Sequence, residues 1–236
     1  MRRRLRSLDV AADGCPMPTP ALSRALSCPL CGADAPFFHR DKRREYFRCL
    51  RCELIFVPPD AHPLPAQEKA EYDLHDNRPD DPGYRRFLSR VFEPVRAELK
   101  PGARGLDFGS GPGPTLSVMF EEAGFPTTIY DPFYAPDRSV LDCAYDFVTA
   151  TEVVEHLHHP ARDLERLWSC VAPGGVLGLM TKMALDLDAF RVWHYKNDLT
   201  HVVFFSRHTF KWLGEGWQAP PSFHAADVVL FRKAPF

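Results

Sequence analysis

One segment constrains the fold of this chain more than any other: residues 105–113 read Gly-Leu-Asp-Phe-Gly-Ser-Gly-Pro-Gly. The pattern predicts a buried strand that runs directly into a glycine-dense turn before a helix. Gly109, Gly111 and Gly113 lack a Cβ, so the turn can adopt left-handed φ values and its backbone can lie against a ligand. The amides that open the next helix favour a carboxylate or phosphate group. The G-x-G-x-G spacing after Asp107 differs from the dinucleotide fingerprint G-x-G-x-x-G, and it predicts a small-molecule cofactor of a kind still open.

Strand and helix patterns alternate from residue 101 onward, which predicts an α/β fold with a mostly parallel sheet. We expect strands at residues 104–108, 127–130, 146–150, 176–180 and 228–232, and helices at residues 116–123, 161–170 and 207–213. Only 14 residues separate Asp131 from Asp146, which is too few for a full helix and another strand. The third strand of the sheet is therefore expected to be short or missing.

Asp131 ends the strand of residues 127–130 and follows Asp107 by 24 residues. An acidic side chain at this position lies at the carboxyl edge of a parallel sheet, beside the glycine turn, where open α/β folds bind their ligands. Its carboxylate can accept hydrogen bonds from both hydroxyls of a ribose. The alternative is an exposed aspartate at a strand end with no ligand.

Four of the seven cysteines form two pairs, Cys28-x-x-Cys31 and Cys49-x-x-Cys52, separated by 17 residues. This spacing is typical of a zinc ribbon, in which four thiolates hold a structural Zn²⁺. A unit of about 30 residues buries too little apolar surface to fold unaided, so metal binding would supply much of its folding free energy. A closed site of this kind has no open position for water and does not catalyse. Cys15, Cys143 and Cys170 are expected to be isolated thiols.

Composition excludes some classes of protein. The longest apolar runs fall well short of the ~18 residues that span a bilayer, and a net charge of -2 gives no general attraction for nucleic acid. The basic start of the chain is followed by acidic residues and prolines instead of an apolar run, so we expect a disordered basic tail at residues 1–26 and no secretory signal. This feature and the odd number of cysteines predict a reducing, cytoplasmic location.

Four segments together resemble the class I S-adenosylmethionine (SAM)-dependent methyltransferases. They are Leu106-Asp-Phe-Gly-Ser-Gly-Pro-Gly, Tyr130-Asp-Pro-Phe, Tyr145-Asp-Phe-Val-Thr-Ala-Thr-Glu-Val-Val-Glu-His-Leu and Val171-Ala-Pro-Gly-Gly-Val-Leu, in the order the family shows. The resemblance implies a Rossmann-like sheet with a reversed last strand and SAM as the cofactor. It also implies that the glycine turn holds the amino-acid end of SAM, that Asp131 binds the ribose, and that Glu152 lies near the methionine or adenosine portion. Without a third strand, Phe133 and Tyr134 are available to cover the adenine ring. Tyr72, His75 and Asn77 are weaker candidates for contacts with the cofactor.

The predicted organisation is a tail at residues 1–26, a zinc ribbon at 27–57, a linker and helical lid at 58–100, and a SAM-binding methyltransferase domain at 101–236. A ribbon followed by this core is similar to bacterial zinc-ribbon methyltransferases, some of them grouped with sugar and quinone methylases. The predicted function is methylation of a small molecule such as a sugar or quinone-type metabolite.

Two alternatives to this function stay open, a ribosomal RNA methyltransferase that binds RNA with its ribbon and a non-catalytic cofactor-binding module. Basic and aromatic side chains alternate in the ribbon, but Asp34, Asp41, Glu45 and Glu53 offset four of its six positive charges, so nucleic acid is the less favoured partner. The acceptor atom and the oligomeric state are not predicted.

The loop of residues 193–201 follows the fifth strand, where methyltransferases commonly place residues that face the substrate. His194 and His201 are the candidates for a general base, because the unperturbed pKa of histidine lies near neutrality. Asp198 is a candidate to orient the base, and Tyr195 is a further candidate active-site residue as a wall of the pocket. The alternative for His201 is a hydrogen bond that only stabilises its loop.

A second group has the ligand types of a metal site: Glu152, Glu155, His156, His158 and His159. The methyltransferase resemblance accounts for Glu152 and His156 without a metal. We therefore predict no catalytic metal from the sequence.

Overall fold

The computed structural model describes residues 25–75 and 77–235. Most of the predicted basic tail, with Cys15, lies outside these residues. The tail boundary at residue 26 was wrong, because Ala25 and Leu26 already belong to strand β1 (Ala25–Ser27). Strand β1 pairs antiparallel with β2 (Asp34–Arg40) and forms the edge of the smaller sheet.

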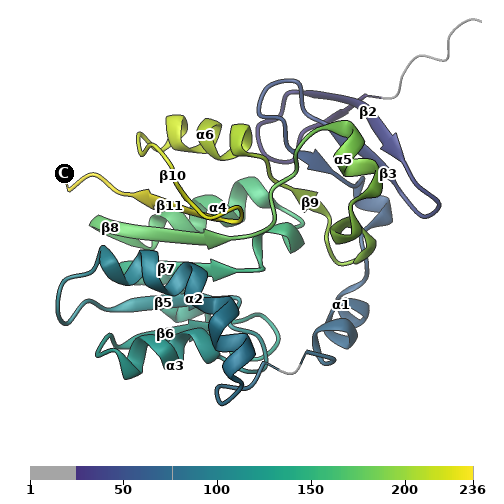
Figure 1. Cartoon of the computed structure of the whole chain (residues 1–236). Coiled ribbons are helices and arrows are strands. Elements are labelled where there is room, and N and C mark those ends of the chain that lie inside the picture. The colour runs from purple at the N-terminus through teal and green to yellow at the C-terminus, as the bar shows by residue number, and fades with distance from the viewer. Residues whose placement is uncertain (1–24, 76, 236) are drawn as a thin grey trace, which may run out of the picture.

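The larger of two sheets has six strands in the order β10-β11-β8-β7-β5-β6 (Figure 1). Strands β6 (Thr127–Tyr130), β5 (Gly105–Phe108), β7 (Tyr145–Thr151) and β8 (Val171–Met180) are parallel. Strand β11 (Val228–Arg232) is antiparallel to β8, and β10 (Ser222–His224) is antiparallel to β11. This arrangement confirms the predicted α/β fold with a mostly parallel sheet and a reversed last strand.

The third strand is missing from this sheet as described, and β6 forms its edge. The chain between β6 and β7 contains only a short 3₁₀ helix, η2 (Arg138–Asp142), together with an isolated bridge between Asp131 and Ala135. The short spacing between Asp131 and Asp146 therefore predicted this departure correctly.

Helices cover both faces of the large sheet. Helices α2 (Pro82–Ala97) and α3 (Thr115–Glu122) pack on one face, where Val176 and Met180 of β8 join their apolar cluster. Helices α4 (Pro160–Ser169) and α6 (Arg207–Gly216) pack on the other face with Leu177 and Leu179. Because alternate residues of β8 face opposite helical layers, the strand is apolar along most of its length, as in other strands that are buried on both sides.

The predicted helical region of residues 67–99 forms two separate helices. Asp81 begins α2 by accepting hydrogen bonds from the backbone N–H groups of Gly83 and Tyr84, with Pro82 at the first helical position. The earlier helix, α1 (Pro65–Tyr72), stands apart from the sheet and faces the carboxyl edge of its parallel strands (Figure 1).

The smaller sheet joins the N-terminal segment to the rest of the chain. Strands β1, β2, β3 (Glu45–Arg48) and β4 (Ile55–Phe56) are followed by β9 (Val203–Phe204), which pairs antiparallel with β4. Helix α5 (Leu187–Val192) and the 3₁₀ helix η4 (His194–Asn197) lie against this sheet, where Phe190 packs with Tyr46 and Phe204. The N-terminal unit and the loop before β9 therefore share one core. In the described part of the chain, no helix is long and apolar enough to cross a membrane.

Candidate active site

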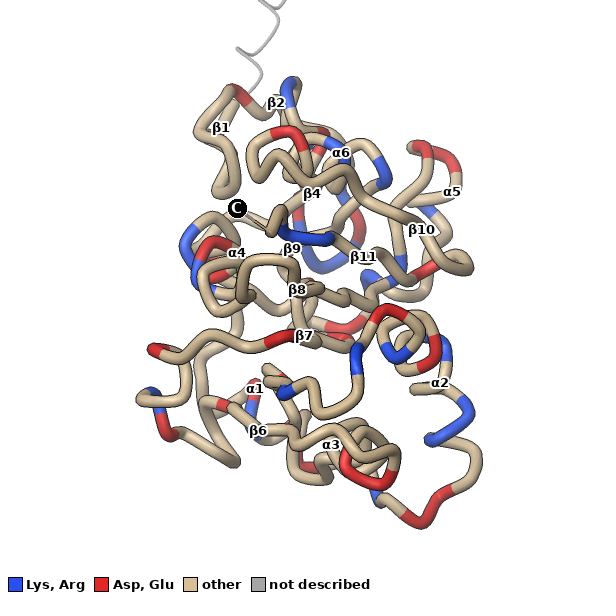
Figure 2. Tube along the Cα trace, turned by 90° about the vertical axis from the view of Figure 1, so that its left-hand side faces the viewer, with Lys and Arg blue, Asp and Glu red and all other residues tan. Residues whose placement is uncertain are grey.

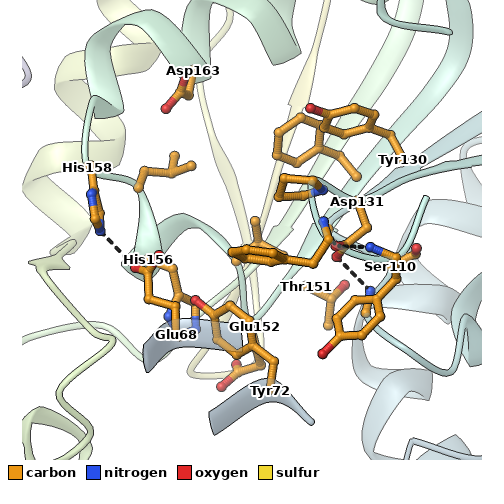
Figure 3. A pocket seen from close by; sticks show the side chains of 18 of the residues that line it. Glu68, Tyr72, Ser110, Tyr130, Asp131, Thr151, Glu152, His156, His158 and Asp163 are labelled. Carbon is orange, nitrogen blue, oxygen red and sulfur yellow. Dashed lines mark hydrogen bonds and ion pairs between the residues drawn. The ribbon is translucent and has the colours of Figure 1, made fainter. Parts of the chain in front are cut away.

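A cavity of about 1270 Å³ opens at the carboxyl edge of β5, β6 and β7. Helices α1, α2 and α4, the segment after β7 and the loop before β9 contribute to its other walls. Figure 3 shows Asp131 and Ser110 on one side, His158 and Glu68 on the other, and Glu152 and Tyr72 between them. The residues predicted to bind the cofactor or to act in catalysis that line the cavity are Gly109, Gly111, Asp131, Phe133, Glu152, Asp198 and His201. The further candidates for cofactor contacts, Tyr72, His75, Asn77 and Tyr134, line it as well.

The glycine turn has the backbone that the sequence predicts. Gly109 and Gly111 have φ angles of 74° and 66°, in the region that favours glycine. A Cβ on Gly109 would lie 2.4 Å from Cγ2 of Val153, and one on Gly113 would lie 2.1 Å from the carbonyl oxygen of Asn77. The turn is therefore packed so closely against two neighbouring segments that only glycine fits at these positions.

Asp107 lies beneath this turn and does not line the cavity. Its side chain is buried, and the Thr149 hydroxyl donates a hydrogen bond to its Oδ1 at 2.8 Å. Burial raises the pKa of Asp107 to about 7, with a smaller contribution in the same direction from the charge of Asp131. Asp107 is therefore a support of the turn that is costly to ionise.

Asp131 organises two loops at the cavity wall. Its Oδ2 accepts a hydrogen bond from the N–H of Gly111 at 3.0 Å, and its Oδ1 accepts from the N–H groups of Phe133 at 2.8 Å and Tyr134 at 3.1 Å. Three amides thus hold the carboxylate of Asp131 between the glycine turn and the loop that follows β6.

Helix α1 is held over the cavity by side chains from two other loops. Glu68 and His158 approach to 2.8 Å between Oε1 and Nε2, and the hydroxyl of Tyr134 donates to Oδ1 of Asp73 at 2.7 Å. The Tyr72 ring lies 5.8 Å from the Phe133 ring and 5.3 Å from the His156 ring. Tyr72 therefore stands between the wall that carries Asp131 and a pair of histidines.

These two histidines, His156 and His201, have the same hydrogen-bonding arrangement. Nδ1 of His156 lies 3.1 Å from the carbonyl oxygen of Thr200, and Nδ1 of His201 lies 2.8 Å from that of Tyr195. A carbonyl oxygen can only accept, so both rings carry their proton on Nδ1 and keep a lone pair on Nε2. Burial lowers the pKa of His156 to about 3 and also lowers the pKa of His201, so both rings are neutral near pH 7.

The four residues predicted as catalytic lie in different environments. Asp198 is close to His201, with 3.7 Å between Oδ2 and Nε2, and its Oδ1 accepts from the Thr200 hydroxyl at 2.6 Å. His194 is exposed, does not line the cavity, and lies 3.3 Å from Nζ of Lys182 through Nε2. Tyr195 is buried behind the cavity wall. The structure thus brings together two of the four, Asp198 and His201.

Two carboxylates share the hydroxyl of Tyr195. This hydroxyl donates to Oε1 of Glu155 and lies 3.2 Å from Oε2 of Glu152. The other oxygens, Oε2 of Glu155 and Oε1 of Glu152, are buried without a hydrogen-bond partner. Burial raises the pKa of Glu152 to about 7 and that of Glu155 to about 8.

The four cysteines of the N-terminal unit converge on one point. All four Sγ atoms lie within 4.8 Å of one another, with 3.6 Å between Cys28 and Cys52 and 3.3 Å between Cys31 and Cys49. Tetrahedral thiolates at a Zn–S distance of about 2.3 Å lie roughly 3.8 Å apart, so the cluster is compatible with a zinc ribbon. Of the other described cysteines, Cys143 is exposed and Cys170 is buried.

The fold and the cavity define a class of protein. A sheet of this order, a glycine turn at the end of its first strand and an acidic residue at the end of the second are those of a class I SAM-dependent methyltransferase. The model of the methyltransferase domain family matches residues 77–217, more than half of the chain, and the chain belongs to this family. Membership of this family favours an enzyme over the alternative of a non-catalytic cofactor-binding module. No curated protein sequence matches the chain.

Solved structures with a similar arrangement include two methyltransferases. An O-methyltransferase family protein from Burkholderia thailandensis is 15% identical, with a TM-score of 0.48, over 74% of this chain and 64% of that one. Magnesium protoporphyrin IX methyltransferase from Synechocystis PCC 6803, solved with bound SAH, is 15% identical, with a TM-score of 0.46, over 64% of this chain and 84% of that one. The chain therefore spans less than two thirds of the length of the first of these proteins.

Proposed function

We propose that this enzyme transfers the methyl group of SAM to a small molecule bound in the same cavity. The size of the cavity carries this proposal. A pocket for one small ligand is typically about 300–1000 Å³, whereas this cavity holds about 1270 Å³. Its walls enclose room for a cofactor and a modest acceptor together, and α1 lies over them. A sugar or quinone-type metabolite fits this description.

The cofactor is proposed to lie along the side formed by the glycine turn and Asp131. The turn, supported from beneath by the buried Asp107, would hold the amino-acid end, Asp131 the ribose, and Phe133 the adenine, with Glu152 near the methionine portion. An ionised carboxylate has about four acceptor positions, and three of those on Asp131 are occupied by amides. One ribose hydroxyl can therefore bind Asp131 without breaking an existing hydrogen bond.

The acceptor is proposed to lie at the end of the cavity lined by His156, Asp198 and His201. The methyl group of a sulfonium is already electrophilic, so the protein mainly has to align the attacking atom and help to remove its proton. The Nε2 lone pair of His201 can accept a hydrogen bond or a proton, or bind a cation. His194 lies outside this end, so we leave it out of the proposed machinery.

The substitution Asp131→Ala tests the placement of the cofactor. Loss of one hydrogen bond to a charged group weakens binding by about 1.5–3 kcal/mol, so affinity for labelled SAM should fall roughly 10- to 100-fold. Asp142→Ala is a matched control, because Asp142 is exposed and lies outside the cavity lining. Equal affinity in the wild-type protein and Asp131→Ala would refute the ribose assignment.

The charges of the N-terminal unit favour a small acceptor over RNA. Arg44 is buried against the loop before β9, and Arg43 donates to the Asn197 carbonyl at 2.7 Å. Salt bridges join Arg40 to Glu45 and Arg48 to Glu53. Figure 2 shows positive and negative residues interspersed along the chain. Methyl transfer to bulk RNA that is lost in a ribbon variant would overturn the proposal of a small acceptor.

We also propose that Cys28, Cys31, Cys49 and Cys52 hold a structural Zn²⁺. None of the six described cysteines forms a disulfide, which supports a reducing compartment, and we propose the cytoplasm. Metal analysis of freshly purified protein should find one more zinc per chain in the wild-type protein than in Cys28→Ser. Protein that is folded but free of zinc would contradict this assignment.

A further inference from the structure

The acceptor end of the cavity contains a cluster with the ligand types and spacing of a metal site. Glu155, His156 and His201 each offer one ligand atom, and these three atoms lie within 4.8 Å of one another. His156 and His201 line the cavity, and Glu155 lies behind them, fully buried. We propose that these three side chains bind a divalent transition-metal cation. The claim that this cation lies beside the methyl acceptor rests on the proposed function. The claim that the three side chains bind a cation does not.

The first argument is one oxygen of the Glu155 carboxylate, Oε2, which has no hydrogen-bond partner. The other oxygen, Oε1, accepts from the Tyr195 hydroxyl, whereas Oε2 is buried. No salt bridge among residues 25–75 and 77–235 contains Glu155. A buried carboxylate with an open oxygen is costly unless a cation, a proton or a donor binds it, so a cation at this site would compete with the proton of Glu155. The two histidines beside it supply only lone pairs, and a cation satisfies all three groups at once.

The second argument is the orientation of the two histidines. A histidine that binds a metal nearly always donates its other ring N–H to a carbonyl or carboxylate, which fixes the tautomer. His156 and His201 both do so, through carbonyl oxygens of the same short loop, Thr200 and Tyr195. Tyr195 therefore orients two ligands, His201 through its carbonyl and Glu155 through its hydroxyl. Both Nε2 atoms keep a lone pair for a cation, and the carboxylate of Asp198, 3.7 Å from Nε2 of His201, adds negative charge beside them.

The alternative is that the two histidines only form hydrogen bonds to backbone carbonyls and bind no metal, and this alternative explains less of the structure than a cation does. It explains the Nδ1 contacts, but it leaves Oε2 of Glu155 without a partner. The site also differs from the cluster seen in the sequence. His158 is bound to Glu68 and His159 is exposed, so neither takes part. His201, which lies far along the chain, completes the set in their place.

The ligand set indicates which cation binds and what it does. Two imidazoles and one carboxylate suit Zn²⁺, Mn²⁺ or Fe²⁺ better than Mg²⁺, which prefers oxygen ligands. Positions left open toward the cavity can take an acceptor hydroxyl, and a nearby cation lowers the pKa of that hydroxyl. Its proton goes to solvent water, and the oxygen forms a bond to the methyl carbon. The C–S bond breaks and its electron pair returns to sulfur. The site therefore selects a hydroxylated acceptor, such as a phenol or a vicinal diol.

The test is a titration with Mn²⁺, followed by electron paramagnetic resonance, of the full-length protein reconstituted with one equivalent of Zn²⁺, which the four thiolates take up first. Mn²⁺ is a useful probe because soft thiolates disfavour it, so the cysteine cluster does not compete. We expect one bound Mn²⁺ per chain. Glu155→Gln and His201→Gln should weaken binding by at least about 100-fold, and Tyr195→Phe, which changes an orienting group, by about 10- to 100-fold. His208→Gln is the matched control, because His208 is exposed on α6 and should bind Mn²⁺ normally.

Labelled SAM binding, measured on the same samples, shows that each variant is folded and separates this proposal from the proposed function. Wild-type protein that binds SAM but no stoichiometric Mn²⁺ refutes the cation site, whatever the variants do. Undiminished Mn²⁺ binding in the double variant Glu155→Gln/His201→Gln also refutes it. Stoichiometric Mn²⁺ that is lost only in the ligand variants supports the site, even in a protein whose methyl acceptor proves to be different.

Discussion

Replacement of Asp107 by asparagine should stabilise the protein at alkaline pH. Asp107 is 4% exposed, and the described structure gives it one hydrogen-bond donor, the Thr149 hydroxyl. Burial raises its pKa from the ordinary value of 3.8 to about 7. The folded protein therefore holds the proton of Asp107 more tightly than the unfolded chain does. This contribution to stability is complete below pH 3.8 and is lost as the pH rises toward 7.

The magnitude follows from the difference between the two pKa values. A shift of about 3 units at 1.36 kcal/mol per unit makes ionised Asp107 cost about 4 kcal/mol above pH 7. Asparagine keeps the shape and the acceptor for Thr149 but has no charge. Its unpaired amide nitrogen costs about 1–3 kcal/mol, so the net gain at pH 8 should be about 1–3 kcal/mol.

Urea unfolding of both proteins at pH 5 and pH 8, with zinc present, measures the effect. The stability of Asp107→Asn relative to the wild-type protein should rise by about 3 kcal/mol between these pH values, because most of the ionisation penalty develops there. The constant cost of the amide cancels from this comparison. The same difference in free energy of unfolding at both pH values would refute the argument, since Asp107 would then titrate as in the unfolded chain.

Two further substitutions test the packing around the cavity. Gly113→Ala places a Cβ 2.1 Å from the Asn77 carbonyl oxygen, so it should lower the free energy of unfolding by about 1–3 kcal/mol and weaken SAM binding. Its control is Gly216→Ala, which should change neither, because the new Cβ meets open space. Arg44→Met removes the donors to four backbone carbonyls, so it should lower the free energy of unfolding by about 2–4 kcal/mol. It should also reduce methyl transfer more than it reduces SAM binding. Its control, Lys42→Met, should change little, because Lys42 is exposed. Equal behaviour of either variant and its control would contradict the packing described.

The sequence predicted the large sheet because its signals are local. Strand and helix patterns, the glycine turn and the short spacing between Asp131 and Asp146 each lie within a few residues of the element they specify. Two features were not predictable in this way. Strand β9 has only two residues and exists because it pairs with β4, far earlier in the chain. The cluster of Glu155, His156 and His201 forms because the loop before β9 folds back against the end of β7, where the N–H of Val202 donates to the carbonyl of Glu155 at 2.9 Å.

The same long-range contacts join the N-terminal unit, the proposed zinc ribbon, to the loop that forms the proposed acceptor end of the cavity. The buried guanidinium of Arg44 donates to the carbonyl oxygens of four residues of the loop before β9: Lys196, Asp198, Leu199 and His201. Strand β4 pairs with β9 directly after this loop. Among the described residues, no strand pairing or backbone hydrogen bond joins the N-terminal unit to the turn after β5 or the loop after β6, which form the cofactor side of the cavity.

Removal of zinc should therefore damage the acceptor end before the cofactor end. A ribbon of this size depends on its metal for folding, and its loss releases both Arg44 and β4 from the loop that holds Asp198 and His201. We expect protein treated with a thiol-competitive chelator to lose methyl transfer and Mn²⁺ binding while it keeps most of its affinity for SAM. Addition of Zn²⁺ should restore both. Loss of SAM affinity in step with zinc would instead show that the ribbon stabilises the whole chain equally, and the contacts of Arg44 would then carry no special function.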